Sequence, residues 1–247
     1  MTEVWSRARR LARRVGGIRD LSLRIRYLRY LARESAPEEV AEILGLAVHL
    51  TEAREHRFGG LALGLCVALA DEDMDEVRAA VAQAAMLGGD YGTAALLSPR
   101  PPLQQPDDPP EVPDFGTGRV PSLGERKSLA RRRDRDLLAR VLSDPHPAVI
   151  RILLSNPALT EPDVVRLCAR RPIGAAVLRE VFRSPRWVTR YAVRRAIVKN
   201  PFTPQDIALQ LCAHLTATDA VLVARSPELG DAVRDACRRV GGLATVH

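Results

Sequence analysis

Apolar side chains recur every three to four residues through the first part of the chain, which is the spacing of one face of an α-helix. Residues 2–15 are apolar on one side and rich in arginine on the other, and residues 18–34 repeat the apolar spacing. Pro37, followed by two glutamates, is typical of the first turn of a helix, which we expect to run to about Glu55. Three more helices are predicted: one that Gly59-Gly60 precedes and that runs to about Ala70, one that opens at Asp71 to Asp75 and stops at Gly88-Gly89, and a short one through Leu97.

Proline interrupts this pattern between residues 98 and 121, a segment that holds eight of the eighteen prolines. Proline has no amide donor and blocks helix formation, so the segment predicts an extended linker. Phe115 is expected to be an ordinary linker residue, and the alternative is that it docks as a hydrophobic anchor. After it, Ser122 and Glu125 have the spacing of a capping box, and a helix is expected over 123–142.

Short breaks then recur, each at a residue that precedes proline and therefore avoids the α region. They are Asp144-Pro145, Asn156-Pro157, Arg171-Pro172, Ser184-Pro185, Asn200-Pro201 and Ser226-Pro227. Three helices are predicted to start at Thr-x-x-Asp, a favourable N-terminal pair: Thr160/Asp163, Thr203/Asp206 and Thr216/Asp219. Short helices of this kind cannot bury their apolar faces alone, so we expect them to stack in pairs.

Both asparagines of the chain fall in such breaks. The stretch from Asp144-Pro-His-Pro through a Val-Ile-Arg run to Asn156-Pro and the helix beginning at Thr160 resembles the variant leucine-rich repeat, a member of the broader HEAT-like group. The resemblance covers about residues 140–215. It implies a helical-repeat fold and a generic role in binding macromolecules.

The best-known variant-repeat protein also has an iron–sulfur cysteine cluster. In this chain Cys66, Cys168, Cys212 and Cys237 are far apart and form no Cys-x-x-Cys or Cys/His cluster. No cofactor or metal is therefore expected, and the cysteines are predicted to be small buried apolar residues.

Together these patterns predict an all-α protein: an α-solenoid of HEAT-like helix pairs with an N-terminal helical region. The expected domains are the N-terminal region 1–97, the Pro-rich linker 98–121 and the repeat domain 122–247. In the first of these, the basic arm 1–34 holds ten arginines against three acids, and helices 35–97 hold three arginines against eleven acids. This opposition favours docking of the arm on 35–97 over adsorption to an anionic membrane surface.

The repeat domain is basic, with twenty-two lysines and arginines against twelve acids. One candidate partner-binding set comprises Arg183, Arg186, Arg190 and Arg194, of which the last three would share one helix face. The other comprises Lys127, Arg131, Arg132 and Arg133. On an inner solenoid surface these side chains would hold phosphates, since each guanidinium forks onto two oxygens. Trp187 and Tyr191, expected on the same helix, would then stack on bases. The competing interpretation is that the arginines are solvated or paired with acids, while Trp187 and Tyr191 pack into the core.

Little in the sequence points to catalysis. The five histidines lie in no pattern of a nucleophile pair or metal site, and no glycine loop follows a strand. The longest apolar run is well short of the ~20 residues that span a bilayer, and the arginines near the N-terminus lead into no secretory signal. No small-molecule substrate is evident.

We therefore expect a cytoplasmic, non-enzymatic scaffold or adaptor that binds a protein partner along the solenoid surface. The alternative is a nucleic-acid-binding module using the Arg-rich face. A repeat-fold enzyme acting on DNA is a third hypothesis with less support.

Overall fold

The computed structural model describes residues 2–107, 111–116 and 118–243, and every regular element within them is a helix. The predicted all-α class is therefore confirmed. The helices fall into two compact units. Unit 1 combines the chain up to Arg100 with the segment from Gln205 onward, and unit 2 is the intervening segment from Pro101 to Pro204.

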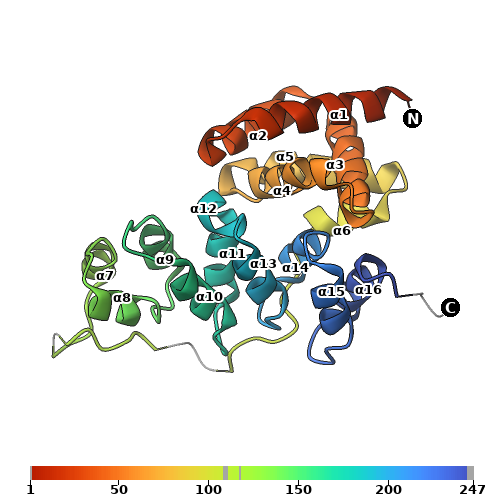
Figure 1. Cartoon of the computed structure of the whole chain (residues 1–247). Helices are drawn as coiled ribbons and strands as arrows, with labels where there is room; N and C mark the ends of the chain where they lie inside the picture. The colour runs from red at the N-terminus through yellow and green to blue at the C-terminus, as the bar shows by residue number, and fades with distance from the viewer. Residues whose placement is uncertain (1, 108–110, 117, 244–247) are drawn as a thin grey trace. The chain divides into compact units, whose positions relative to one another are not determined.

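Unit 1 opens with α1 (Thr2–Gly17) and α2 (Leu21–Glu34), which pack on α3 (Pro37–Glu52) and α4 (His56–Leu69) (Figure 1). Asp20 caps α2 by accepting the Leu23 amide, and Pro37 begins α3 as predicted. A 3-10 turn (Glu72–Met74) leads into α5 (Asp75–Leu87), which packs on α6 (Tyr91–Leu97). Helix α4 is the centre of the unit, because every residue from Leu61 to Leu69 is buried.

The prediction that Gly59-Gly60 precedes the fourth helix is wrong, since both glycines lie inside α4. A glycine inside a helix costs about 1 kcal/mol relative to alanine, which is far less than burial of the apolar residues that follow contributes. A third glycine shows why small residues suit this helix. A Cβ on Gly64 would lie 2.6 Å from Cδ1 of Leu28, so the close packing of α2 on α4 depends on its absence.

The last three helices of the chain complete unit 1: α14 (Gln205–Cys212), α15 (Ala217–Ala224) and α16 (Asp231–Val240). Arg54 joins the two segments, because its guanidinium donates to the carbonyls of Leu215 at 2.6 Å and Val240 at 2.8 Å. Its own backbone is in the left-handed region, with φ of 68°. This division differs from the expected domains, which assigned 205–247 to the repeat domain. The sequence of α14–α16 does not indicate which helices they pack on. In the structure α14 packs on α4 and α6.

Unit 2 contains seven helices in its described residues, all of them short. They are α7 (Leu123–Leu129), α8 (Arg135–Val141), α9 (Pro147–Leu154), α10 (Glu161–Ala169), α11 (Ala175–Arg183), α12 (Pro185–Val188) and α13 (Tyr191–Val198). Contacts run from α7 to α9, from α9 to α11 and from α10 to α13. The capping boxes of Ser122/Glu125 and Thr160/Asp163 form as predicted.

Two predicted helix starts and one predicted helix span after residue 121 have different outcomes. Thr216 caps α15 by accepting the Asp219 amide, as expected. Thr203 does not cap α14, because its hydroxyl donates to the Ile197 carbonyl at 2.6 Å. The single helix expected over 123–142 is divided into α7 and α8. The division is stabilised by Asp134, which accepts the Leu137 amide and starts α8 anew.

From Pro101 on, the described parts of the Pro-rich segment contain no helix before α7 and belong to unit 2. Phe115 is buried, so its prediction as an ordinary linker residue is wrong. The carbonyl beside it, on Asp114, accepts a hydrogen bond from Arg140 at 3.3 Å, and the Gln104 amide donates to the Pro201 carbonyl at 3.1 Å. These contacts bind the segment along the unit at both of its ends.

Candidate functional site

The two asparagines perform the same structural task in unit 2. The side-chain amide of Asn156, after α9, donates to the carbonyls of Ala130 and Arg132 at 2.9 and 2.7 Å. That of Asn200, after α13, donates to the carbonyls of Cys168 and Arg170 at 2.8 and 2.9 Å. Each side-chain oxygen accepts the amide two residues on, from Ala158 or Phe202. Each asparagine thus satisfies carbonyls that the end of an earlier helix, α7 or α10, leaves open.

The arginines of the first candidate set do not share a helix face. Arg183 ends α11, Arg186 lies in α12, Arg190 is the N-cap of α13, and Arg194 lies within α13. The predicted common face of Arg186, Arg190 and Arg194 is therefore wrong. Helix α12 ends at Val188, with Thr189 as its C-cap. The Arg194 guanidinium stabilises this end, because it donates to the carbonyls of Val188 and Thr189 at 3.1 and 2.7 Å.

Most of this set is occupied by contacts inside unit 2. Arg183 pairs with the buried Glu180 at 3.2 Å. Arg186 donates to the carbonyls of Asn156 and Leu159 and stacks 4.3 Å from the Trp187 ring. Burial lowers the pKa of Arg194 from its ordinary value. Arg190 is exposed, 3.9 Å from a Glu161 carboxylate oxygen.

The two aromatic residues beside this set differ in burial. Trp187 is buried, and its indole N–H donates to the Leu154 carbonyl at 2.7 Å, so the core interpretation is confirmed for this residue. Tyr191 is half-buried, with the Arg194 guanidinium 5.8 Å from its ring centre. Neither ring has the fully open face on which a base would stack.

The second candidate set lies at the turn between α7 and α8. Arg131, Arg132 and Arg133 are exposed, and Lys127 is half-buried. Arg131 donates to the Lys127 carbonyl at 3.0 Å, which ties one guanidinium to its own helix. This turn therefore exposes positive charge to solvent. Unlike the first set, it has no aromatic residue close by in the sequence.

Asp163 is the most strongly held carboxylate of unit 2. It accepts from Arg135 at 2.8 and 3.0 Å and also from Arg166, the Thr160 hydroxyl and the Thr160 amide. The Arg135 hydrogen bonds, with those from Thr160 and Arg166, hold the pKa of this buried carboxyl well below its ordinary value.

This depressed pKa makes a pH-dependent contribution to stability. The folded state holds the proton of Asp163 less tightly than the unfolded chain does, so the contribution is present above the ordinary aspartate pKa, near 3.9, and is lost as pH falls below it. We expect the urea midpoint of Asp163→Asn to fall less between pH 5 and pH 3 than that of the unaltered chain. Asp136→Asn, at an exposed position of α8, is the control and is expected to keep the full acid dependence. Equal slopes for the unaltered chain and Asp163→Asn would contradict this assignment.

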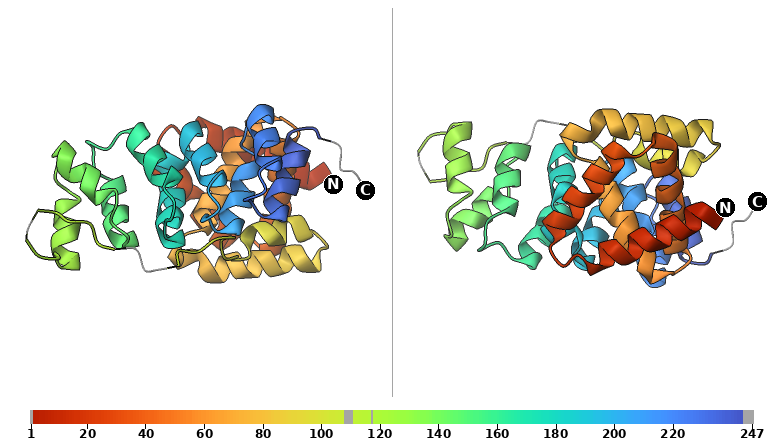
Figure 2. Two further views of the ribbon diagram at one scale, coloured as in Figure 1. Left: turned by 90° about the horizontal axis from the view of Figure 1, so that it is seen from below. Right: turned by 90° about the horizontal axis from the view of Figure 1, so that it is seen from above.

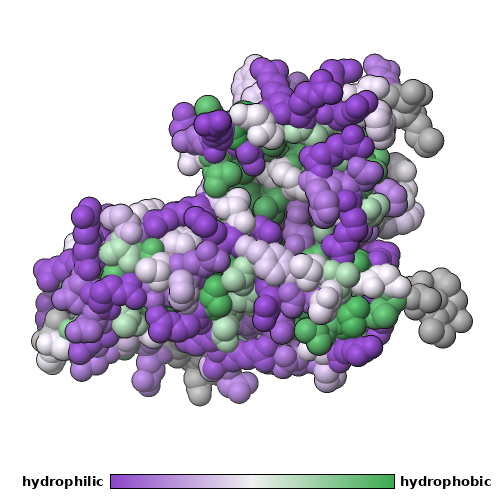
Figure 3. All heavy atoms as spheres, in the orientation of Figure 1, coloured by the Kyte–Doolittle hydropathy of each residue, from purple (hydrophilic) through white to green (hydrophobic). Residues whose placement is uncertain are grey.

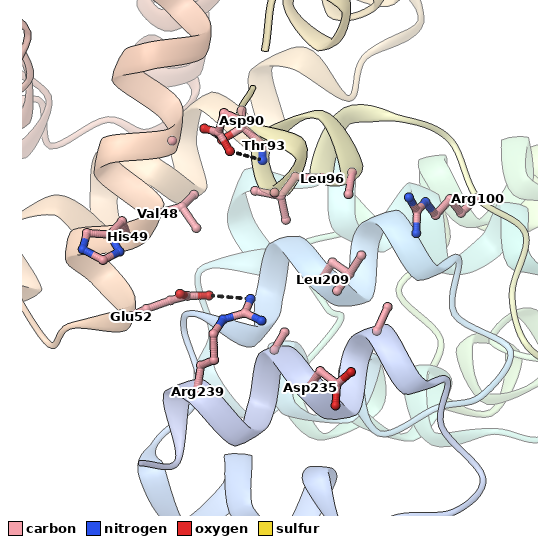
Figure 4. A pocket seen from close by; sticks show the side chains of 15 residues that line it. Val48, His49, Glu52, Asp90, Thr93, Leu96, Arg100, Leu209, Asp235 and Arg239 are labelled. Atoms are coloured by element: carbon pink, nitrogen blue, oxygen red, sulfur yellow. Dashed lines mark hydrogen bonds and ion pairs between the residues drawn. The ribbon is translucent and has the colours of Figure 1, made fainter. Parts of the chain in front are cut away.

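Unit 1 contains a cavity of ≈ 440 Å³ between α3, α6, α14 and α16 (Figure 4). Its apolar lining includes Val48, Leu96 and Leu209. Glu52 and Arg239 turn toward each other at 3.5 Å, and Asp90 is occupied by capping α6 through Thr93. Its charged side chains include acids and arginines, so the lining does not select one charge of ligand.

No protein-family model matches this chain, and no curated protein or solved structure is significantly similar to it. Within the part of the chain that the structure describes, no group of three or more His, Cys, Asp or Glu side chains is placed to hold a metal ion. None of its helices combines the length and the apolar character needed to cross a bilayer.

The cysteines are buried as predicted. Burial raises the pKa of the Cys66 thiol to about 12. Cys212 and Cys237 bring their sulfur atoms within 3.4 Å of each other, and the hydrogen bond between the two thiols, with burial, raises the pKa of Cys212. Cys212 is thereby kept protonated, and both sulfur atoms are buried, which suits packing rather than nucleophilic chemistry.

The basic arm docks on helices 35–97, as the sequence favoured. Helix α1 packs on α3 and α4 through Ala8, Leu11, Ala12 and Val15, all buried. Ion pairs join Arg7 to Glu39, Arg29 to Asp71 and Arg33 to Asp73. The docking leaves several arginines of the arm exposed.

Proposed function

We propose that the chain is a non-enzymatic helical scaffold that binds a protein partner through the apolar tip between α5 and α6. The tip comprises Met86, Leu87 and Tyr91, grouped around the Gly88-Gly89 turn, where Gly89 adopts a φ of 79° that favours glycine. The exposed fractions of the three side chains, which carry the proposal, are 54%, 81% and 71%. Clusters of large apolar and aromatic side chains that are exposed to solvent are typical of protein interfaces.

Charge specifies the chemistry of the proposed partner. Residues 86–91 contain no basic side chain, and Asp90 lies exposed within the turn. A partner segment with an apolar anchor and flanking basic residues would complement both properties. Aromatic residues such as Tyr91 commonly provide most of the binding free energy at such contacts.

The scaffold proposal retains the HEAT-like solenoid and the variant leucine-rich repeat resemblance for the repeats of unit 2. Its support is the matched bonding of Asn156 and Asn200, each of which joins its own loop to the end of an earlier helix. A bond repeated in successive segments is what a stacked repeat requires. A cytoplasmic location is part of the same proposal.

The alternative function, nucleic-acid binding through the Arg-rich face of the repeat domain, has weaker support. Arg183 donates a hydrogen bond to Glu180, and Arg186 and Arg194 donate to backbone carbonyls. Moving these side chains onto phosphates would leave buried carbonyls without donors, at about 1–3 kcal/mol each.

Site-specific photo-crosslinking tests the proposed contact. We expect a photoreactive residue at position 87 of the full chain to crosslink a single protein species in the cells that express it. The same residue at position 222, where Leu222 is exposed on α15, is the matched control and should not.

The purified partner identified in this way then gives a quantitative test. Leu87→Ala and Tyr91→Ala should each weaken its binding by roughly tenfold or more in calorimetry, as expected for interface anchors. Leu222→Ala should leave the affinity unchanged. Identical crosslinks from positions 87 and 222, or an unchanged affinity for both tip variants, would rule out the tip as the contact.

A further inference from the structure

The ten arginines of the basic arm divide into two groups by their partners. Three pair with acids of the helices below, and Arg24 donates to the Ile18 carbonyl at 2.6 Å. The other six have no carboxylate within ion-pair distance among the residues that the structure describes. This outward arginine face comprises Arg9, Arg10, Arg13, Arg14, Arg19 and Arg26.

Helix geometry makes this face continuous. On α1 the side chains of Arg9, Arg10, Arg13 and Arg14 lie outside the buried Leu11 stripe, and those four residues apart are neighbours along the helix surface. Arg14 stacks 4.9 Å from the ring of Tyr27 on α2, which joins the two helices along their outer side. In the right-hand view of Figure 2, α1 and α2 lie uncovered toward the viewer.

Aromatic and apolar side chains are interleaved with the arginines. Trp5 is partly exposed with the Arg9 guanidinium 5.3 Å from its ring centre, and Tyr30 is 63% exposed on the outer side of α2. Leu23 is exposed beside them, and the surface over α1 and α2 in Figure 3 is mostly hydrophilic with an apolar patch. The carboxylates of these two helices and their turn lie toward the ends: Glu3, Asp20 and Glu34.

The composition of this face points to phosphate groups that follow one another along a chain. A guanidinium forks onto two oxygens of one phosphate, and none of these six has a carboxylate among the described residues to displace first. Exposed rings between such charges offer stacking surfaces for unpaired bases. A duplex keeps its bases stacked on each other and would leave Trp5 and Tyr30 unused.

A membrane surface fits this face less well. Membrane-bound amphipathic helices insert their apolar side at the headgroup boundary. Here the apolar sides of both helices are already inside unit 1, through Leu11 and Val15 of α1 and Ile25 and Leu28 of α2. Insertion would require these helices to leave the core.

We propose that the outward arginine face is a binding surface for single-stranded nucleic acid. The phosphates contact Arg9, Arg10, Arg13, Arg14, Arg19 and Arg26, and unpaired bases stack on Tyr30 and on the open side of Trp5. The proposal does not rest on the protein-binding tip, which lies on other helices of unit 1.

Fluorescence anisotropy with the full chain tests this surface. The probe is a fluorescein-labelled 20-nucleotide single strand of mixed sequence, titrated at several salt concentrations. With six phosphate contacts, the logarithm of the binding constant should fall against the logarithm of salt with a slope of roughly −4. Removing three of the contacts by Arg10→Ala, Arg13→Ala and Arg26→Ala together should reduce the slope to roughly −2 and weaken binding on the order of tenfold or more.

A charge-matched variant separates this surface from the net charge of the protein. Arg131→Ala, Arg132→Ala and Arg133→Ala together remove the same three charges from the turn between α7 and α8. We expect this variant to bind like the unaltered chain. Equal losses for both triple variants, or no loss for either, would overturn the proposal, as would an unaltered chain that does not bind the strand at low salt.

Two further measurements address the bases and the membrane. Tyr30→Ala should weaken single-strand binding by about fivefold or more while leaving the salt slope unchanged. A hairpin duplex of equal phosphate number should bind more weakly than the single strand. Equal affinity for the duplex, or stronger binding to phosphatidylserine vesicles than to the strand, would overturn the assignment. Circular dichroism should show the same helical signal for every variant, since the replaced side chains are exposed.

Discussion

Replacing Asp144 with alanine is expected to lower the free energy of unfolding by about 3–5 kcal/mol, because it leaves a buried arginine without its counter-charge. Asp144 is completely buried and accepts two hydrogen bonds from Arg126, at 2.8 and 2.9 Å. One of its oxygens also accepts the His146 amide at 2.9 Å, where α9 begins. The change therefore removes an ion pair and a loop contact together.

Urea denaturation followed by circular dichroism measures this loss. The double variant Arg126→Met and Asp144→Asn removes both charges while keeping an acceptor for the His146 amide. We expect it to recover at least half of the stability that Asp144→Ala loses, because neither partner is then left charged and unpaired. If Asp144→Ala lowered the free energy of unfolding by less than about 1 kcal/mol, the expectation would be wrong, and water would solvate Arg126 well enough to replace the ion pair.

Replacing Asn200 with alanine is expected to cost about 2–4 kcal/mol, since an unsatisfied buried polar group costs about 1–3 kcal/mol and more than one is created here. The carbonyls of Cys168 and Arg170 lose their donor, and the Phe202 amide loses its acceptor. Asn200→Asp should be at least as damaging, because it sets a carboxylate oxygen against two carbonyls.

Thermal unfolding and urea midpoints of Asn200→Ala and Asn156→Ala test whether the two asparagines are equivalent. We expect losses within about 1 kcal/mol of each other, because both make the same three kinds of bond. Ser155→Ala, beside Asn156 but exposed, should change stability by less than about 0.5 kcal/mol. A large loss for one asparagine and none for the other would contradict the equivalence.

Helix starts could be predicted from the sequence wherever a local side chain fixes them. Pro37, Ser122 and Thr160 each act on an amide or turn within a few residues, so spacing along the chain is sufficient. Helix breaks made by distant groups could not. The division of α12 from α13 depends on Arg194 reaching back to the Val188 carbonyl, and no glycine or proline marks it. The glycine pair within α4 failed as a break because burial outweighed its propensity.

The candidate site was only partly predictable for the same reason. The arginine spacing at Arg186, Arg190 and Arg194 describes one face only if the helix is continuous, and it is not. For the basic arm, the sequence favours docking, and the structure adds which arginines remain outside. A helical projection of residues 2–15 contains part of this signal, because Arg10 and Arg13 lie opposite the apolar stripe, whereas Arg14 projects close to Arg7, which does pair with Glu39.

The split composition of unit 1 has a consequence for the order of synthesis. Its first helices leave the ribosome early, but α14, which packs on α4 and α6, is made only after the whole of unit 2. Leu96 illustrates the delay, because its carbonyl accepts a hydrogen bond from the Gln210 side chain, which is synthesised more than a hundred residues later. The unit begun second is therefore the first that can be completed on the ribosome, and α1–α6 must persist as a partial core until the last segment arrives. Nascent chains stalled shortly after Pro204 would contain a finished unit 2 beside an unfinished unit 1.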